Sequence, residues 1–513
     1  MSFRKNESQQ ISMFDSFTGL TEREQKALNQ SWAKVFSEDV FPTIDEDRFS
    51  VLYSDKASRP NTPVNVIIGA LVLKELFNLS DDEVVEDILL DPRFQYALHT
   101  SSFLEQPISD KTLTRFRQRC YDYEQLHGVD LYHDCVTDLG KKTAKLMGID
   151  GRIRRMDSLM VEANIRKLSR MELIYRCISK LVVFLHKTAH DDLLEGLEHY
   201  YDPDDFNRVI YHSRSTEADD RMITLLADAD ILQERCGDKF QDNTEYQLLV
   251  RCLSEQTIVE EGTRRLRTKE DGQMGSGILQ NPSDPDATYR EKAGKHHRGY
   301  AANVEESVGE NGSVITDYQF HTNNVSDSVM LKEKIDSMEQ QEEQVTIITD
   351  GAYAGEDNTR MAADKNIQLI TTDLPGKDVP AIVGKLELNE EETRVLKCPA
   401  GYEPLSSSFI RQTGTCTASF DRDKCANCPY QKECKAKIFK RVAKVRVTGK
   451  QVRRASLQEK MKEEEYKLYA RLRNGVETIP SLLKNVYNVY YTAVCGKIKC
   501  KLCFGSKIST LNF

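Results

Sequence analysis

Apolar residues recur at helical spacing through the first 150 residues of the chain. Val64–Phe77 carries apolar side chains about one turn apart, which predicts a helix. Ser80 and Glu83 have the spacing of a capping box and predict the start of a second helix, and Ser109 is placed to cap a third. We therefore expect a helical N-terminal domain over 1–150. Such short helices fit a DNA-reading helix-turn-helix arrangement, and they equally fit a plain helical bundle with a basic outer face.

Beyond residue 150 the pattern changes to strand-like runs separated by helical ones. A short run, Gly151–Asp157, predicts a strand, and a long helical stretch follows over Ser158–Arg267. Gly272–Gly299 is rich in Gly, Pro and Asp and predicts a break. Further strands are predicted at Tyr300–Val308, Val314–Thr322, Val345–Thr349 and Ile367–Thr372, with helices around Asp327–Glu342 and Gly355–Lys365. This order describes a mixed α/β sheet.

The segments after the predicted sheet have a different character. Pro375–Lys435 is an insertion rich in cysteine, and the pattern returns to helix around Ser456–Arg473. We therefore expect four regions. They are the helical domain at 1–150, a mixed sheet at 151–375 with a helical insertion at about 158–298, the cysteine-rich insertion at 376–435, and a basic segment with a C-terminal helical part at 436–513.

The composition is that of a globular protein in a reducing compartment. Of the 513 residues, 39% are hydrophobic and 30% are charged, which provides ample material for a core. No apolar run approaches the roughly 20 residues of a membrane span, and the N-terminus, MSFRKNESQQ, lacks the apolar core of a signal peptide. We therefore expect a cytosolic protein with no membrane partner, whose thirteen cysteines are reduced thiols or metal ligands.

Part of the cysteine-rich insertion has the spacing of a zinc site. Cys425 and Cys428 form a CxxC pair, Cys434 follows six residues later, and Cys398 lies upstream on a CPxG turn. Tetrahedral Zn²⁺ takes four thiolate or imidazole ligands, often in pairs a few residues apart. We predict structural Zn²⁺ on these four cysteines, with Cys416 as the spare. Scattered reduced thiols are the alternative.

One segment is strongly basic although the whole chain has a net charge of −10. Lys435–Arg454 holds nine Lys or Arg and no acid. Such a cluster binds phosphates well because counterions are released, and local charge distribution matters more for this than net charge. The alternative is a solvated strand pair with a charged face. The cations expected to contact DNA phosphates here are Lys440, Arg441, Lys444 and Arg446.

Two aspartates stand where predicted strands end. Asp157 closes the first strand-like run, Asp350 follows Val345–Thr349, and a small residue comes next in both cases. A carboxylate is costly to bury unless it is paired or binds a cation, and adjacent strands would bring these two acids together. A hard divalent cation such as Mg²⁺ relieves their repulsion and supports phosphoryl transfer. Each aspartate taken alone is equally explained as a strand-end or turn residue.

A candidate for a third acid lies near the C-terminus. Arg473 and Glu477 are four residues apart, and Lys484 is seven beyond Glu477, so a helix would place the three on one face. Such a group suits a metal and DNA phosphates, and a surface row of ion pairs is the alternative. Gly475 and Pro480 oppose a straight helix, so we expect a kink or a new helix there.

Several long stretches, spread over most of the chain, match one family. They are YSDKASRPNTPVNVIIGALVLKELFNLSDDEVVEDILLDPRFQYALHT, PISDKTLTRFRQR, MDSLMVEANI, NPSDPDATYREK, GYAANV, VTIITDGAYAGED, the cysteine cluster and RNGVETIPSLLK. With these stretches the chain resembles a DDE transposase of a bacterial insertion sequence, of the group numbered eleven-eighty-two, which is related to the Tyr-Arg-Glu-Lys transposases. Matches of this length are far more specific than any one motif.

The resemblance implies a fold and a catalytic site. The fold is a ribonuclease-H-like mixed sheet core with a helical N-terminal domain, a helical insertion and a small zinc-binding insertion. The implied catalytic acids are Asp157, Asp350 and Glu477, with Mg²⁺ or Mn²⁺ as cofactor. Arg473, Glu477 and Lys484 match the family spacing of Arg, Glu and Lys. The family tyrosine falls on Ala470, with Tyr469 beside that position.

The function implied is metal-dependent DNA cleavage at insertion-sequence ends, followed by strand transfer into target DNA. Its place would be the bacterial cytoplasm, at the nucleoid. DNA would be the partner, and the chain would act as a homodimer or higher oligomer on DNA. The alternatives are a catalytically silent DNA-binding remnant or regulator, and a ribonuclease-H-like nuclease without strand transfer. Asp286 and Asp327 are interpreted as turn residues or as supports behind the site.

Overall fold

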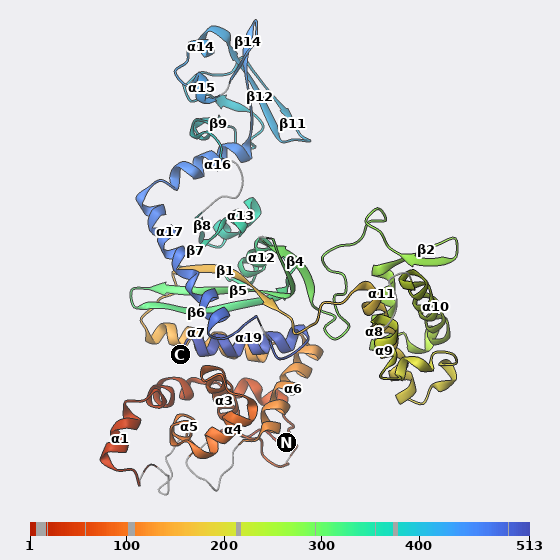
Figure 1. Cartoon of the computed structure of the whole chain (residues 1–513). Coiled ribbons are helices and arrows are strands. Elements are labelled where there is room, and N and C mark those ends of the chain that lie inside the picture. The colour runs from red at the N-terminus through yellow and green to blue at the C-terminus, as the bar shows by residue number, and fades with distance from the viewer. Residues whose placement is uncertain are drawn as a thin grey trace. The chain divides into compact units, whose positions relative to one another are not determined.

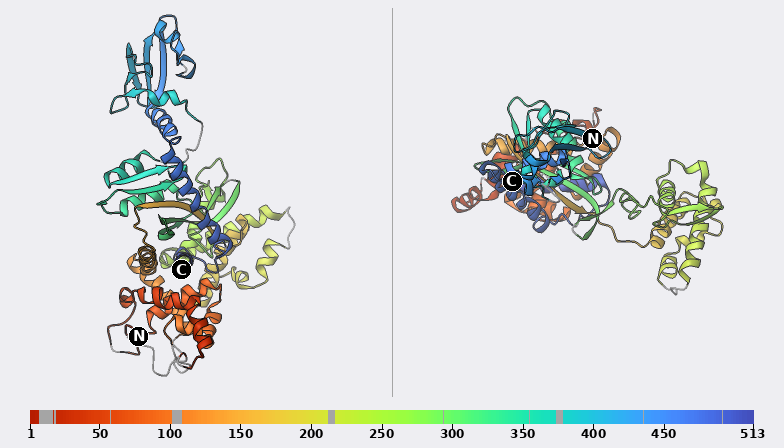
Figure 2. Two further views of the ribbon diagram at one scale, coloured as in Figure 1. Left: turned by 90° about the vertical axis from the view of Figure 1, so that its left-hand side faces the viewer. Right: turned by 90° about the horizontal axis from the view of Figure 1, so that it is seen from above.

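The computed structural model describes residues 1–6, 17, 19–56, 58–100, 108–211, 217–292, 294–353, 355–372, 378–434, 436–490 and 492–513. They form two compact units. Figure 1 and Figure 2 draw the whole chain, coloured from the N-terminus to the C-terminus. Unit 1 consists of Met1–Gly151, Asp157–Met330 and Thr478–Phe513, and unit 2 of Arg152–Met156 and Leu331–Glu477. In the described parts of the chain, no helix is both long enough and apolar enough to cross a membrane.

The N-terminal part of unit 1 is built mainly of helices, as predicted. They are α1 (Glu22–Asn29), α2 (Trp32–Val35), α3 (Val64–Leu76), α4 (Asp81–Leu90), α5 (Pro92–Ala97), α6 (Asp110–His127) and α7 (Leu131–Leu146). Helix α3 is buried from Val64 to Leu73 because it is apolar on all sides. Ser80 and Glu83 form the capping box of α4, and Ser109 forms one at the start of α6, so both predicted helix starts are confirmed.

The C-terminal helix completes the core of these N-terminal helices. Helix α19 (Lys497–Leu511) contacts α3, α6 and α7 (Figure 1). The Thr510 hydroxyl donates to the Val72 carbonyl over 3.0 Å, and Lys507 forms a 2.7 Å ion pair with Glu75. The side chains of α19 and α3 belong to one continuous hydrophobic cluster. The two ends of the chain therefore fold together.

An antiparallel group of strands also belongs to unit 1. It consists of β4 (Thr288–Lys292), β5 (Lys295–Gly309) and β6 (Gly312–Thr322). Just before β4, the buried Asp284 accepts hydrogen bonds from the Tyr300 hydroxyl at 2.6 Å and from the Gly496 amide at 2.9 Å. Asp286 accepts from the Lys497 amide at 3.2 Å. These carboxylates satisfy amides where α19 begins, a position that favours negative charge.

The helical insertion of unit 1 starts later than predicted. Strand β1 runs over Ile153–Glu162, so Gly151–Asp157 was too short and the helical stretch does not begin at Ser158. The strand continues because Leu159, Met160 and Val161 are apolar and buried. The insertion contains α8 (Arg170–Lys187), α9 (Asp205–Ile210), α10 (Ala218–Cys236) and α11 (Thr244–Gln256), around a hydrophobic cluster of its own.

The end of the predicted helical stretch is also corrected. Helix α11 is followed by the hairpin of β2 (Thr257–Glu260) and β3 (Thr263–Leu266). The strand-forming residues Thr257, Ile258 and Val259 override the helical pattern. Glu261 and Gly262 link the strands with φ of 50° and 80°, as a two-residue hairpin turn requires.

Unit 2 contains the parallel strands. The first residues of β1 pair with β7 (Val345–Thr349), which pairs with β8 (Ile367–Thr371). Helices α12 (Asp327–Ser337) and α13 (Glu356–Asp364) belong to the same stretch, and Leu331, Ile335 and Ala362 pack with β7 in one cluster. The strand order is β4-β5-β1-β7-β8, with β6 paired to β5. Parallel and antiparallel pairs thus make a mixed sheet, as predicted.

The cysteine-rich part of unit 2 has its own small sheet. Its strands are β11 (Ser406–Ile410), β12 (Thr415–Asp421), β14 (Val442–Thr448) and β13 (Lys437–Ile438), in that order. The short pair β9 (Glu387–Leu388) and β10 (Val395–Lys397) and helices α14 (Arg422–Ala426) and α15 (Gln431–Cys434) surround it. The expected boundary at 375/376 and Lys435 lie outside the described residues.

Two helices lead out of the small sheet, and a third follows after a break. They are α16 (Gly449–Lys460), α17 (Glu464–Val476) and α18 (Thr478–Asn485). Glu477 is the residue between α17 and α18. A new helix therefore begins just before Pro480, as the sequence suggested, since proline is tolerated in a first helical turn.

Candidate catalytic site and cysteine-lined pocket

Asp350 lies directly after a fully buried strand. All five residues of β7 are buried, and Asp350 begins the turn that follows, where one of its oxygens accepts a 2.9 Å hydrogen bond from the Ala352 amide. Its side chain remains 27% exposed, so the carboxylate is accessible at the edge of a rigid strand. This is the position that the sequence predicted for it.

Asp157 lies in β1, the strand that pairs with β7. In the parallel pairing of β1 with β7, Arg155 is opposite Ile348. Asp157 follows Arg155 by two residues, and Asp350 follows Ile348 by two residues. The expectation that Asp157 ends its strand is wrong, because β1 continues to Glu162. One Asp157 oxygen accepts a 2.9 Å hydrogen bond from the Ser158 amide.

Arg473 joins two of the three predicted acids within unit 2. It lies in the last turn of α17, and its guanidinium is 3.7 Å from an Asp350 oxygen and 2.8 Å from a Glu477 oxygen. Arg473 is largely shielded, with 17% of its side chain exposed, whereas Glu477 is 66% exposed. A cation therefore lies between two carboxylates that are far apart in the sequence, which lowers the cost of holding them close together.

The other members of the predicted motif have contacts of their own. Lys484 is in α18 of unit 1, with its ammonium 5.5 Å from the centre of the Tyr490 ring. The hydroxyl of Tyr469 donates to Glu465 over 3.1 Å. Burial and this hydrogen bond raise the pKa of Tyr469 above its usual value. Tyr469 is thus engaged one turn away along α17 and does not reach Arg473 through any hydrogen bond of the described residues.

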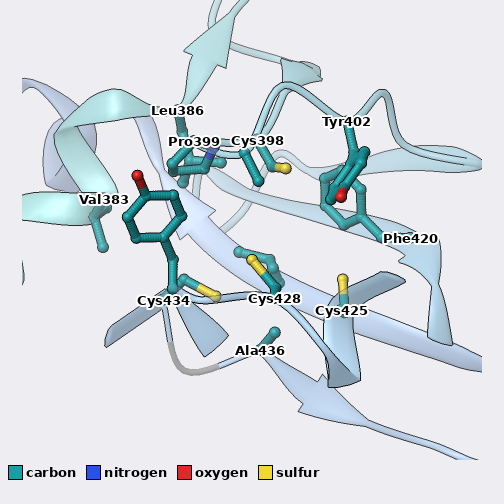
Figure 3. Close-up of a pocket in the computed structure, with 13 residues that line it drawn as sticks. Val383, Leu386, Cys398, Pro399, Tyr402, Phe420, Cys425, Cys428, Cys434 and Ala436 are labelled. Atoms are coloured by element: carbon teal, nitrogen blue, oxygen red, sulfur yellow. The ribbon is translucent and has the colours of Figure 1, made fainter. Parts of the chain in front are cut away.

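The four cysteines predicted to bind zinc line one pocket (Figure 3). Cys398 follows β10, Cys425 lies in α14, Cys428 follows α14, and Cys434 ends α15. The pocket holds about 30 Å³, which is room for a water molecule or a small ion. The spare, Cys416, is buried in β12 and donates to the Glu392 carbonyl over 3.1 Å.

The pocket combines soft donors with an apolar surround. Its other lining residues include Leu386, Phe420 and Val445. Burial, together with the nearby thiols of Cys398, Cys434 and Cys428, raises the pKa of Cys425 to about 11. Four thiols gathered in an apolar pocket are the donor set that Zn²⁺ takes in structural sites. Among the described residues, however, no three His, Cys, Asp or Glu side chains are arranged closely enough to hold a metal ion as they stand.

The small sheet presents cations and hydroxyls on the face opposite the pocket. Along β14, Ala443, Val445 and Val447 are buried, whereas Lys444 and Arg446 are exposed. Strand register puts a hydroxyl beside each exposed cation. The rows across β14, β12 and β11 are Lys444–Ser419–Ser406 and Arg446–Thr417–Ser408, and Lys437 of β13 extends the first row.

The cations of this face have no acidic partner within the part of the chain that the structure describes. No ion pair with an acid involves Lys437, Lys440, Arg441, Lys444 or Arg446 there. The Lys444 ammonium is instead 5.7 Å from the centre of the Phe439 ring, which is 50% exposed. By contrast, Arg453 of the same basic segment pairs with Glu356 and Glu392. Unneutralised cations beside hydroxyls suit a polyanion.

The basic face expected on the N-terminal helices is partly neutralised. In α6, Arg117 pairs with Asp81, and the Arg119 guanidinium is 4.7 Å from the centre of the Tyr53 ring. Lys111 and Arg115 are exposed. Residues 101–107, which precede α6, lie outside the described residues, so the choice between a DNA reader and a plain bundle stays open.

Sequence reasoning missed Arg155. This residue looks like one of several polar residues in the run GRIRRMD, yet it is only 8% exposed and donates to the Leu472 carbonyl over 2.7 Å. An arginine inside a strand, two residues before a candidate catalytic acid, is the one signal that the sequence contains.

Two family models of transposase domains match parts of the chain. The model of the transposase domain DUF772 matches residues 25–119, and that of the transposase DDE domain matches 397–513. The second match includes Arg473, Glu477, Lys484 and the predicted zinc ligands, whereas Asp157 and Asp350 lie outside both. No curated protein matches the chain. The matched segments are similar to transposase domains and together cover less than half of the chain.

Among solved structures, the chain is similar to the cryo-EM structure of the piggyBac transposase synaptic complex with hairpin DNA. The identity is 8%, the TM-score is 0.28, and the match covers 94% of this chain and 72% of that one. A likeness of this size carries no argument about mechanism.

Proposed function

We propose that this protein is a DDE transposase that cleaves DNA at the ends of an insertion sequence and joins those ends to target DNA. The observation that carries the proposal is the Asp350–Arg473–Glu477 cluster. It joins the end of a buried strand to the end of α17, and the DDE family match includes its two C-terminal members. A largely shielded cation between two carboxylates from separate elements favours a chemical site over a surface row of ion pairs.

Asp157, Asp350 and Glu477 are the proposed ligands of catalytic Mg²⁺ or Mn²⁺. The β1–β7 register supports Asp157 as a ligand. Arg155 is opposite Ile348, and Asp157 and Asp350 each follow one member of that pair by two residues. Carboxylate oxygens are the donors that these hard cations prefer. The bound metal would supply activation of a nucleophile and charge stabilisation at phosphorus. The proposed core is ribonuclease-H-like.

The chain's own residues have distinct roles in this proposal. The buried strand β7 holds Asp350 at a rigid edge, and Arg473 neutralises and orients the two carboxylates until DNA and cations arrive. Arg473 and Lys484 then contact phosphates. Water and afterwards a DNA 3′-hydroxyl are the nucleophiles, so no covalent bond between protein and DNA forms. One site can therefore perform both DNA cleavage and joining, because the two reactions differ only in the nucleophile.

The cysteine-rich part of unit 2 is proposed to be a DNA-binding element that Zn²⁺ stabilises. Zn²⁺ on Cys398, Cys425, Cys428 and Cys434 would hold together an insertion with a small core. The opposite face would contact phosphates through Lys440, Arg441, Lys444 and Arg446. Residues 1–150 are proposed to contribute recognition of the element ends, and the chain to act as a homodimer or higher oligomer on DNA.

The proposal is tested by incubating the full chain with candidate element ends, Mg²⁺ and a target plasmid, and by scoring cleaved and joined products. Both products are expected, and both should disappear with EDTA. Binding without any cleavage would identify a silent remnant or regulator. Cleavage without joining would identify a nuclease, provided that pre-cleaved element ends with a free 3′-hydroxyl are not joined to the target either.

A further inference from the structure

Arg155 connects strand β1 to the end of helix α17. Its guanidinium donates a 2.7 Å hydrogen bond to the Leu472 carbonyl, directly before the last turn of α17. The arginine is buried, with 8% of its surface exposed. A buried guanidinium is costly unless its donors are satisfied. Here it also benefits from the negative end of the helix, where carbonyl groups accumulate.

Gly475 makes this contact possible. A Cβ atom at Gly475 would overlap the Arg155 guanidinium, with Nη1 as its nearest neighbour. The backbone of Gly475 is not in the left-handed region, so space rather than conformation explains the glycine. Glycine inside a helix is destabilising relative to alanine. The contact with Arg155 is therefore a physical reason for a residue that otherwise weakens α17.

The residues of this contact are close in the sequence to those of the proposed site. Leu472 directly precedes Arg473, Gly475 is two residues before Glu477, and Arg155 is two residues before Asp157. The hydrogen bond thus joins β1 to the residue directly before Arg473, whose guanidinium lies 3.7 Å from Asp350. Small displacements of a catalytic group are sufficient to cost orders of magnitude in rate.

We propose that Arg155 is a positioning residue, which clamps the end of α17 through Leu472 and Gly475 so that Arg473 and Glu477 keep their place beside Asp350. This inference rests on the proposed function for its catalytic consequence. The clamp itself does not rest on it, because the contact has consequences for α17 that are measurable without DNA.

The test compares full-length Arg155→Ala, Arg155→Lys, Gly475→Ala and the double variant Arg155→Ala/Gly475→Ala. Hydrogen exchange of peptides covering residues 464–477 reports on the clamp, with peptides covering β7 as internal control. Arg155→Ala should speed exchange in the last turn of α17 and leave β7 protected. Arg155→Lys should restore part of the protection, because its ammonium can donate to the same carbonyl. Gly475→Ala should disturb the turn, and removing the Arg155 side chain should relieve that disturbance.

Cleavage kinetics then separate positioning from general stability. Arg155→Ala should lower kcat by about tenfold or more, with the DNA Kd and the unfolding midpoint near those of the parent. The clamp would be overturned if hydrogen exchange of α17 in Arg155→Ala were the same as in the parent. It would also be overturned if the effects of Arg155→Ala and Gly475→Ala on that exchange were additive in the double variant. Faster exchange with parental kcat would overturn the catalytic role alone. If the parent cleaves no DNA, the proposed function fails while exchange still decides the clamp.

Discussion

The guanidinium of Arg473 lies 2.8 Å from the carboxylate of Glu477, one helical turn further along the chain, and 3.7 Å from that of Asp350. A single, largely shielded cation thus lies between two acids from separate elements. In a site built for divalent ions, such a cation reduces carboxylate repulsion before the ions bind, and it then competes with them. Both consequences can be measured.

Replacing Arg473 should change metal affinity and catalysis in opposite directions. Without DNA, Arg473→Ala should bind Mn²⁺ more tightly than the parent, because the competing charge is gone. Cleavage should fall because a phosphate contact is lost. Calorimetric titration with Mn²⁺ measures the first effect, and Arg471→Ala on the same helix is the control. Weaker Mn²⁺ binding by Arg473→Ala would show that the arginine does not compete for the metal position.

Purified protein should contain about one Zn²⁺ per chain, as one four-thiolate site requires. Cys428→Ala should lose this zinc and loosen the small sheet. Cys416→Ala is the matched control and should keep it, because Cys416 lies in β12 away from the pocket. Elemental analysis of protein purified without added zinc decides the matter. Well-folded parent with no zinc, or loss of zinc in Cys416→Ala, would contradict the assignment.

Zinc retention should also depend on pH. Burial and the neighbouring thiols raise the pKa of Cys425 to about 11, so its thiol is protonated at neutral pH without metal. Since zinc binds the thiolate, binding must release protons, and affinity should rise as pH rises from 6 to 8. Competition with a chromogenic chelator across this range measures the slope. A pH-independent affinity would argue against thiolate ligands.

Neutralising the exposed face of the small sheet should weaken binding to every DNA sequence. For Lys444→Gln/Arg446→Gln, the slope of log K against log salt should become shallower by about 2, because each phosphate contact contributes about 0.9. Lys462→Gln/Lys467→Gln makes the same charge change on lysines that are paired with glutamates, and should leave the slope near that of the parent. Binding isotherms at four salt concentrations are sufficient. Equal slopes for the two variants would remove this face from the DNA contact.

The stability of unit 1 should fall at alkaline pH through His133. Burial opposes charge on this ring, but hydrogen bonds to Asp134 and Asp317 and the charges of Asp317 and Asp130 outweigh it and raise the pKa to about 10. The raised pKa stabilises the fold fully below the unfolded value near 6.5, and the contribution is lost as pH rises through 10. The thermal unfolding midpoint of the parent should fall more between pH 7 and 10 than the midpoint of His133→Gln. Parallel curves would contradict this.

Local signals predicted much of this fold. The strand Val345–Thr349 and the helix starts at Ser80 and Ser109 are read from neighbouring residues, and they occur as predicted. The cysteine spacing likewise selected the four thiols that line one pocket. In each case the information lies within a few residues, where pattern and capping rules apply.

The features that were missed depend on partners far away in the sequence. Strand β1 continues past Asp157 because its later residues are buried by elements that periodicity does not reveal. Nothing local indicates that α19 completes the core of α3. From the sequence, Gly475 is interpreted as a helix breaker, because its close approach to the Arg155 guanidinium is evident only in the structure. The candidate acids were selected by strand ends and family likeness, whereas the bridge through Arg473 required the structure.

The most direct test of the central claim is DNA cleavage by Asp350→Asn, which keeps the shape of the side chain and removes its charge. We expect cleavage and joining to fall by about 10²–10³-fold or more, with DNA binding and folding unchanged, and the same for Asp157→Asn and Glu477→Gln. Asp357→Asn is the control, since Asp357 is an exposed acid on α13 that pairs only with Arg360 among the described residues, and it should cleave like the parent. Robust cleavage by Asp350→Asn would contradict the account.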